Sequence, residues 1–279
     1  MNTVTVSAGD TLSGIAQKFG VTVASLLKIN ALDDPNLIRI GQTLRIPELT
    51  TDLSDHPAPP PARRSTRGPV PIDRRTFRLP ESQFFRQTQP KDLIVLHFTA
   101  GGSARSAFQT WISTPVEVAT PYIVDTDGTI YELFDPSCWA YHLGIQGAAA
   151  ENWRHDRRSI PIEIVNVGPL RKVDSQLCWW PKNFGQRFCA LDEKEKFVQI
   201  AYRGFDYFAA FPEVQQKAVA DLVGWLSAQF NIPLNLPPAA QRGQFNLNFF
   251  REWKGVASHQ NFRPDKSDLG PAFDWGLLG

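Results

Sequence analysis

The chain has 279 residues, 42% of them hydrophobic, and a formal net charge of +1. This length favours two domains, and the near-neutral charge gives no general attraction to nucleic acid or to an anionic membrane. No apolar run reaches the length of a membrane span. The first residues lack the basic and apolar regions of a secretory signal, so either the chain begins at a mature end or it leaves the cytoplasm by a route that does not read such a signal.

Cysteine is scarce, with one residue at each of positions 138, 178 and 189. Three cysteines do not make a disulfide framework. Cys178 and Cys189 could pair if the protein works outside the cytoplasm, and two semi-buried thiols are an equal alternative.

The first 49 residues read as a self-contained βααβ unit. Residues 3–6 and 40–46 alternate as strands, and apolar residues recur at helical spacing within 10–20 and 22–30. Asp10 is suited to cap the first of these helices. We therefore expect a small domain over residues 1–49.

Residues 50–76 change character and are rich in proline and arginine. This composition predicts an extended linker, without secondary structure of its own. The arginines between Arg63 and Arg86 are either a patch for an anionic polymer or a solvated segment, and the solvated segment is the simpler interpretation.

Residues 77–279 read as one α/β domain, a mixed β-sheet flanked by helices. Aliphatic runs predict buried strands over 92–97 and 159–167. Asp127-Gly128 indicates a hairpin between 122–126 and 129–133. Ser103 and Pro212 are suited to begin two helices. Residues 168–211 are hard to read; they are a lid, a sugar-stacking platform or, most simply, a packed insertion.

Three polar residues lie close together near the C-terminus, in the string SHQNFRPDKSDLGPAFDW (258–275). His259 and Asp268 are metal-ligand types, with Lys266 between them. His97 stands at the end of the buried strand over 92–97. Two histidines and one carboxylate leave a fourth zinc position open for water, as in hydrolytic zinc sites.

Each of these residues also has an ordinary explanation. His97 alone could be a satisfied strand-end histidine and Lys266 a surface lysine. Glu163, however, lies in an apolar strand, where an unpaired carboxylate is costly, so it predicts a polar cavity. His56 and His155 are expected to be solvated.

The first 49 residues resemble a LysM module in the strings VTV (4–6), GDTL (9–12), FGV (19–21) and IGQTLRIP (40–47). The resemblance implies binding of glycans that contain N-acetylglucosamine. It places the binding groove at Gly9, Asp10, Thr11 and Leu12, with Asn36, Leu37 and Ile38 opposite.

Residues 77–279 are similar to the zinc-dependent N-acetylmuramoyl-L-alanine amidases, a family related to peptidoglycan recognition proteins. Five strings carry the similarity in the family's order: LHFTAGG (96–102), PYIVDTDGTIYEL (121–133), WAYHLG (139–144), SIPIEIVNVG (159–168) and KSDLGPAFDW (266–275).

The similarity implies roles for individual residues. The Zn²⁺ ligands fall on His97, His259 and Asp268. The catalytic glutamate falls on Glu163, with Lys266 stabilising the oxyanion. Two further positions match family residues, and we expect Tyr122 to contribute to catalysis and His142 to line the substrate cleft.

The resemblances together imply cleavage of the amide between N-acetylmuramic acid and L-alanine in peptidoglycan. The alternative is a non-catalytic peptidoglycan-binding protein. We expect a monomer that acts in the periplasm or cell wall as a secreted effector or endolysin-like enzyme. A dedicated delivery protein or an immunity protein would then be a partner, whereas nucleic acid would not.

Overall fold

The protein is described by a computed structural model that divides into two compact units, Met1–Ala58 and Pro59–Gly279. The structure describes residues 2–7, 15, 26, 29–30, 32, 38–46, 69–145 and 149–279.

The first unit is built on two short antiparallel strands, β1 (Asn2–Thr5) and β2 (Thr43–Ile46). Leu44 and Ile46 alternate inward from β2 and bury against Val6, Ile15 and Leu26. The strand begins three residues later than predicted, because Gly41 adopts a φ of 84° in a turn in which Gln42 N donates to Arg39 O. The predicted helices lie mostly outside the described residues.

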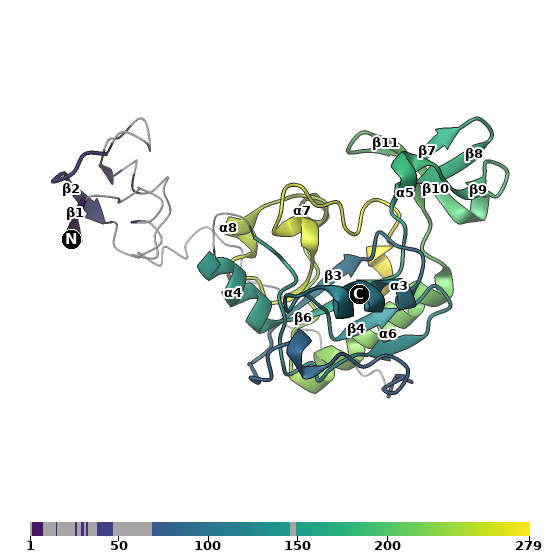
Figure 1. The fold of residues 1–279 in the computed structure, drawn as a ribbon, viewed down its shortest axis with the longest axis horizontal. Helices are drawn as coiled ribbons and strands as arrows, with labels where there is room; N and C mark the ends of the chain where they lie inside the picture. The colour runs from purple at the N-terminus through teal and green to yellow at the C-terminus, as the bar shows by residue number, and fades with distance from the viewer. Residues whose placement is uncertain are drawn as a thin grey trace. The chain divides into compact units, whose positions relative to one another are not determined.

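The second unit is organised around a five-stranded sheet in the order β12-β3-β6-β4-β5. Figure 1 labels its three inner strands, β3, β6 and β4. The first four strands are parallel to their neighbours and β5 is antiparallel to β4. Their bounds are β3 Leu93–Phe98, β4 Tyr122–Val124, β5 Ile130–Glu132, β6 Ser159–Ile164 and β12 Gly255–Ser258. The α/β class, the buried strands and the hairpin predicted from sequence are confirmed.

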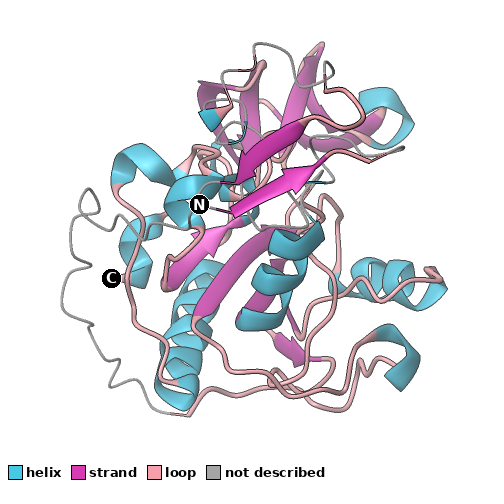
Figure 2. Ribbon diagram, turned by 90° about the vertical axis from the view of Figure 1, so that its left-hand side faces the viewer, coloured by secondary structure: helices cyan, strands magenta, loops and turns pink. Residues whose placement is uncertain are grey.

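Helices cover both faces of this sheet (Figure 2). The long helix α6 (Glu213–Phe230) packs Val219, Leu222, Val223 and Leu226 against one face. On the other face α3 (Ala104–Ser113) buries Ala104 and Trp111, and Ser103 caps it by accepting a hydrogen bond from Ser106 N. The remaining short elements are η1 (Glu81–Gln83), α4 (Ala149–Arg158), α7 (Ala239–Arg242), α8 (Leu247–Phe250), η3 (His259–Asn261) and η4 (Trp275–Leu278).

Residues 70–76, predicted as the end of the linker, pack on the second unit instead. Val70 and Ile72 contact the core under α6, and Asp73 adds to the edge of β5 through Asp73 N to Ile130 O and Glu132 N to Asp73 O. Apolar side chains and free edge groups of β5 explain this docking.

The segment that was hardest to read, residues 168–211, forms a second sheet in the order β10-β11-β7-β8-β9, antiparallel throughout. We call it the inserted sheet. It is composed of β7 Pro169–Val173, β8 Gln176–Trp179, α5 Pro181–Phe184, β9 Gln186–Ala190, η2 Lys194–Lys196, β10 Phe197–Tyr202 and β11 Phe205–Ala209.

The positions of Cys178 and Cys189 in the inserted sheet decide whether these two residues form a disulfide. Cys189 lies opposite Leu177 and shares its face, whereas Cys178 points to the other face; both thiols are free. Among the described residues no helix is long and apolar enough to span a membrane.

Candidate active site

Three parallel strands bring polar residues to one edge of the central sheet, where their carboxyl ends meet. His97 and Glu163 are register partners on β3 and β6, and His259 follows β12 directly. On β3, Ile94 and Leu96 face α6, so His97 faces the opposite side together with Leu93 and Val95. The site therefore forms at the strand ends, the usual ligand position in open α/β sheets.

Asp268 completes a compact cluster with the two histidines. His97 Nδ1 lies 3.0 Å from His259 Nδ1 and 3.6 Å from Asp268 Oδ2, and the third edge, His259 Nδ1 to Asp268 Oδ2, is 3.2 Å. All three residues are less than 8% exposed. Within the part of the chain that the structure describes, this is the one metal-ligand cluster of three or more residues.

The cluster fits a zinc ion in both geometry and chemistry. Ligand bonds of about 2.0–2.1 Å in a tetrahedral site place ligand atoms about 3.3 Å apart, which the three measured distances bracket. His259 Nε2 donates to Leu143 O at 2.8 Å, which leaves the Nδ1 lone pair of a neutral ring facing the cluster. Burial, with His259 alongside, lowers the pKa of His97 to about 4, so neutral imidazole prevails at pH 7.

Asp268 supplies the negative charge of the cluster. Burial opposes that charge, but the neighbouring histidines outweigh it and hold the pKa of the carboxyl below its usual range. Two imidazoles and one carboxylate form a donor set that suits Zn²⁺.

Glu163 faces this cluster from the adjacent strand and is partly exposed. Its side chain makes no hydrogen bond within the described residues. Burial raises the pKa of Glu163 to about 8, Asp268 adds to the rise, and Lys266 lowers it. A carboxyl group with a perturbed pKa beside a metal-ligand cluster is the arrangement of a proton-transfer group.

Two family models match the chain. The LysM domain matches residues 4–47 and the N-acetylmuramoyl-L-alanine amidase domain matches residues 87–271. The chain belongs to the N-acetylmuramoyl-L-alanine amidase family. The match covers the strands and loops that carry His97, Glu163, His259 and Asp268.

Individual proteins resemble shorter stretches of the chain. N-acetylmuramoyl-L-alanine amidase XlyA from Bacillus subtilis (strain 168) is 60% identical over 42 residues, 15% of this chain and 14% of the relative. The secreted LysM effector ECP6 from Passalora fulva is 50% identical over 44 residues, 16% of this chain and 19% of the relative. The chain thus spans less than a fifth of the length of these curated relatives.

Among solved structures, the catalytic domain of XlyA aligns over 71% of this chain and 90% of its own, with 15% identity and a TM-score of 0.40. The assignment to the amidase family rests on the family match, not on this alignment.

Tyr122, expected in the amidase site, lies elsewhere. Its strand position pairs with Ile162, so the ring points into the core under α6, on the face opposite Glu163. The hydroxyl donates to Glu132 Oε2 at 3.1 Å. The structure therefore does not bring Tyr122 to the cluster, because alternation along β4 sends this side chain to the other face.

His142, expected to contact substrate, is also placed differently. Its side chain is 2% exposed and lies between His97 Nε2, at 2.9 Å from its Nδ1, and Ser159 Oγ, at 2.7 Å from its Nε2. It is a neighbour of the cluster rather than part of a cleft surface. Sequence reasoning missed Ser159 and the Leu143 carbonyl, since neither carries a motif of its own.

His155, expected in solvent, is fully buried in α4 near Glu151. In the LysM unit, Ile38 is half-buried against the core of Val6 and Leu44. The other residues of the predicted glycan groove, namely Gly9, Asp10, Thr11, Leu12, Asn36 and Leu37, lie outside the described residues, as does His56.

Proposed function

We propose that this chain hydrolyses the amide between N-acetylmuramic acid and L-alanine in peptidoglycan. The proposal is carried by one observation: a buried His-His-Asp cluster, with ligand atoms at zinc spacing, lies beside the Glu163 carboxyl, which has no hydrogen-bond partner in the part of the chain that the structure describes. The family match supports the same activity.

His97, His259 and Asp268 would hold the zinc. When bound, zinc supplies Lewis acidity that polarises a carbonyl and lowers the pKa of water. Glu163 takes the proton of the attacking water while the water oxygen bonds to the lactyl carbonyl carbon. The same carboxyl delivers that proton to the nitrogen of L-alanine as the C–N bond breaks. The products are a lactyl carboxylate on the glycan and a free amine on the peptide.

Lys266 is the proposed cation for the developing oxyanion. It lies close enough to both Glu163 and His97 to lower their pKa values, so its charge acts inside the site. A fixed cation beside a developing oxyanion stabilises the transition state more than the ground state.

The test is Glu163→Gln, which keeps shape and removes the base. We expect zinc to stay bound and cleavage of purified sacculi, read as new amino termini, to fall by about 10²–10⁴-fold. Glu213→Gln, at an exposed site on α6, is the matched control and should keep wild-type activity. A wild-type rate in Glu163→Gln would remove Glu163 from this role. Zinc-loaded wild-type protein that releases no amino termini would favour the alternative of a peptidoglycan binder.

For the first unit, we propose glycan binding through residues 9–12 and 36–38, supported by the LysM match. Co-sedimentation with sacculi tests it: Asn36→Ala together with Thr11→Ala should release the protein into the supernatant, and unchanged pelleting would contradict it.

We further propose a lytic role on wall polymer outside the cytoplasm, with zinc-dependent toxicity. Expression with a periplasmic signal should lyse cells, whereas cytoplasmic expression should be tolerated. Equal tolerance in both compartments would contradict this role, and with it the need for a delivery or immunity protein.

A further inference from the structure

The inserted sheet is tied to both segments that carry the metal-ligand residues. Trp180 Nε1 donates to Ala100 O at 2.6 Å, in the loop after His97. Tyr202 donates its hydroxyl to Gln260 Oε1 at 2.7 Å, next to His259, and Arg203 Nη1 donates to Pro264 O at 2.8 Å, in the loop that leads to Asp268. The inserted sheet therefore forms a wall beside the catalytic residues.

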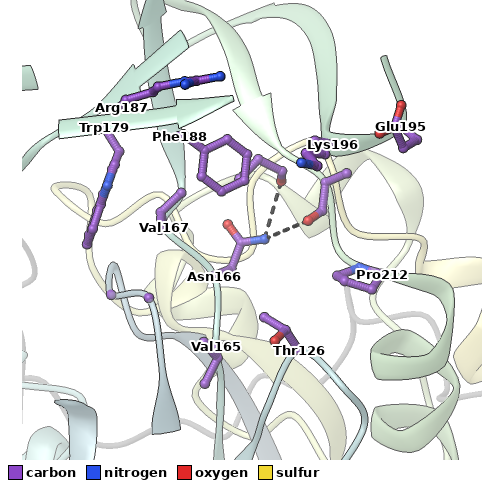
Figure 3. Close-up of a pocket in the computed structure, with 14 residues that line it drawn as sticks. Thr126, Val165, Asn166, Val167, Trp179, Arg187, Phe188, Glu195, Lys196 and Pro212 are labelled. Atoms are coloured by element: carbon purple, nitrogen blue, oxygen red, sulfur yellow. Dashed lines mark hydrogen bonds between the residues drawn. The ribbon is translucent and has the colours of Figure 1, made fainter. Parts of the chain in front are cut away.

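A cavity of about 570 Å³ lies between this wall and the strand ends. Phe188 and Trp179 face it from the inserted sheet, and Asn166 lies on the β6 side (Figure 3). Its volume is within the roughly 300–1,000 Å³ range of small-molecule sites. Val165 and Asn166 follow Glu163 by two and three residues, which is about 7–10 Å along an extended strand. One substrate can reach both places.

The lining favours a sugar ring over a charged peptide group. Most of the hydrogen-bonding capacity of the Asn166 side chain is used, because Nδ2 donates to Ala209 O and Ala210 O and Oδ1 accepts from Gly168 N. The cavity interior is otherwise mostly apolar, with the Thr126 hydroxyl on its edge and the exposed charged side chains of Arg187, Glu195 and Lys196 on its rim. Aromatic faces with polar groups at the margin suit the C–H face and the hydroxyls of a pyranose.

We propose that this cavity binds a sugar of the glycan strand that carries the scissile amide, a role that rests on the proposed amidase function. Trp179 and Phe188 provide the stacking surface. The cavity thereby makes the enzyme prefer polymeric strands over isolated muramoyl peptides.

The test compares two substrates, a muramoyl peptide with one sugar and a strand of several disaccharide-peptide units. In Trp179→Ala and Phe188→Ala, kcat/KM on the strand should fall about tenfold, the effect of losing one aromatic contact, with little change on the single-sugar substrate. Trp153→Ala, at an exposed tryptophan on α4 outside the cavity, is the control. Equal losses of kcat/KM on both substrates would overturn the proposal. So would a loss of kcat/KM whose size depends on the length of the substrate's peptide rather than on its number of sugars.

A binding measurement separates this proposal from the amidase function. All eight tryptophans lie at position 111 or later, so the first unit contributes no tryptophan signal. An N-acetylglucosamine tetramer should change the fluorescence of the full chain, and Trp179→Phe should remove most of the change. An unchanged response in Trp179→Phe would overturn the cavity assignment. If the wild-type protein shows the expected fluorescence change but cleaves neither substrate, the amidase function is refuted and the cavity assignment stands.

A separate observation concerns His142. Ser159 Oγ lies 2.7 Å from His155 O, and because a carbonyl only accepts, the hydroxyl donates to it. The oxygen of Ser159 then accepts from His142 Nε2. A neutral His142 with its hydrogen on Nε2 has a lone pair on Nδ1, which accepts from His97 Nε2. His97 Nδ1 is left without a hydrogen, facing His259 and Asp268.

We infer that His142 and Ser159 are positioning residues, which hold His97 in the tautomer that can bind a metal. The His155 carbonyl sets the direction of the whole chain of hydrogen bonds. The Leu143 carbonyl fixes the tautomer of His259 directly, because it accepts a hydrogen bond from His259 Nε2. Both imidazoles thus present lone pairs to one point before any cation arrives.

The test uses zinc affinity, measured by competition with a chelator and without substrate. His142→Phe keeps a ring but no nitrogen, and should weaken affinity about 10–100-fold. His142→Asn keeps an acceptor near the position of Nδ1 and should recover most of the loss. Nitrogen NMR of the metal-free protein should show hydrogen on Nε2 of His97 in the wild type and a tautomer mixture in His142→Phe.

Two results would overturn the inference: wild-type zinc affinity in His142→Phe, or an unchanged His97 tautomer in that variant. If His142→Phe does not fold, Ser159→Ala decides in its place. It should shift the His97 tautomer in the same direction, and an unshifted tautomer would refute the chain. A purely structural role would lower stability without moving the tautomer.

Discussion

Lys91 should be one of the most important single side chains for the stability of the second unit. It is 6% exposed, and its Nζ donates to Cys138 O at 2.8 Å, Arg157 O at 2.8 Å and Ser159 O at 3.0 Å. These carbonyls belong to three segments: the loop before Trp139, the end of α4 and the start of β6. Burial lowers the Lys91 pKa to about 7, so at pH 6 the ammonium is charged and its three hydrogens match three acceptors.

Lys91→Met removes all three donors and leaves the carbonyls buried. Hydrogen bonds to a charged group contribute about 1.5–3 kcal/mol each and are not additive, so we expect a loss of about 4 kcal/mol in the free energy of unfolding. For a domain of this size that corresponds to a melting temperature about 8–16 °C lower.

Denaturant unfolding at pH 6, followed by tryptophan fluorescence, reports on the second unit because no tryptophan precedes Trp111. Lys254→Met is the control, since its Nζ is 3.7 Å from Asp92 on the surface and its side chain is 63% exposed; it should cost less than about 1 kcal/mol. If the two variants lose the same stability, the three carbonyl contacts do not contribute as the structure implies.

Three further outcomes follow. Tyr122→Phe should keep kcat within about twofold and lose about 1 kcal/mol of stability, because the substitution removes only the hydrogen bond to Glu132. A large fall in kcat would instead indicate that Tyr122 contributes to catalysis. Burial raises the Asp156 pKa to about 7, so between about pH 4 and pH 7 the folded state holds a proton that the unfolded chain releases. This proton therefore contributes a term to the free energy of unfolding that falls with rising pH by up to about 1.4 kcal/mol per unit, and Asp156→Asn should remove that contribution from the slope in urea titrations. Removing the metal with a chelator should lower the hydrolysis rate at least about 100-fold, with recovery on adding Zn²⁺; full activity after chelation would exclude a zinc role.

The sequence was enough to predict the features that depend on local spacing. Aliphatic runs gave the strands that carry His97 and Glu163, Asp127-Gly128 gave the hairpin, and Ser103 gave the cap of α3. The resemblance to the amidase family placed His97, His259 and Asp268 together, and the structure brings their ligand atoms within 3.6 Å of one another.

Other features depend on contacts between residues far apart in the chain. The inserted sheet has weak local patterning, because its strands are short and several face solvent, so only pairing between neighbouring strands reveals it. His155 and Lys91 are ordinary polar residues in sequence, and burial of each follows from segments that close over them from elsewhere in the chain.

The difference between the two kinds of information is clearest in the site itself. The sequence determined which residue types gather at the strand ends, since parallel strands bring their carboxyl ends to one edge. Only the tertiary structure decided which face each side chain takes: Tyr122 turns into the core under α6, whereas His142 reaches between His97 and Ser159. The physical reason is that the direction of a side chain is fixed by what packs against it, and for both residues those partners are distant in sequence.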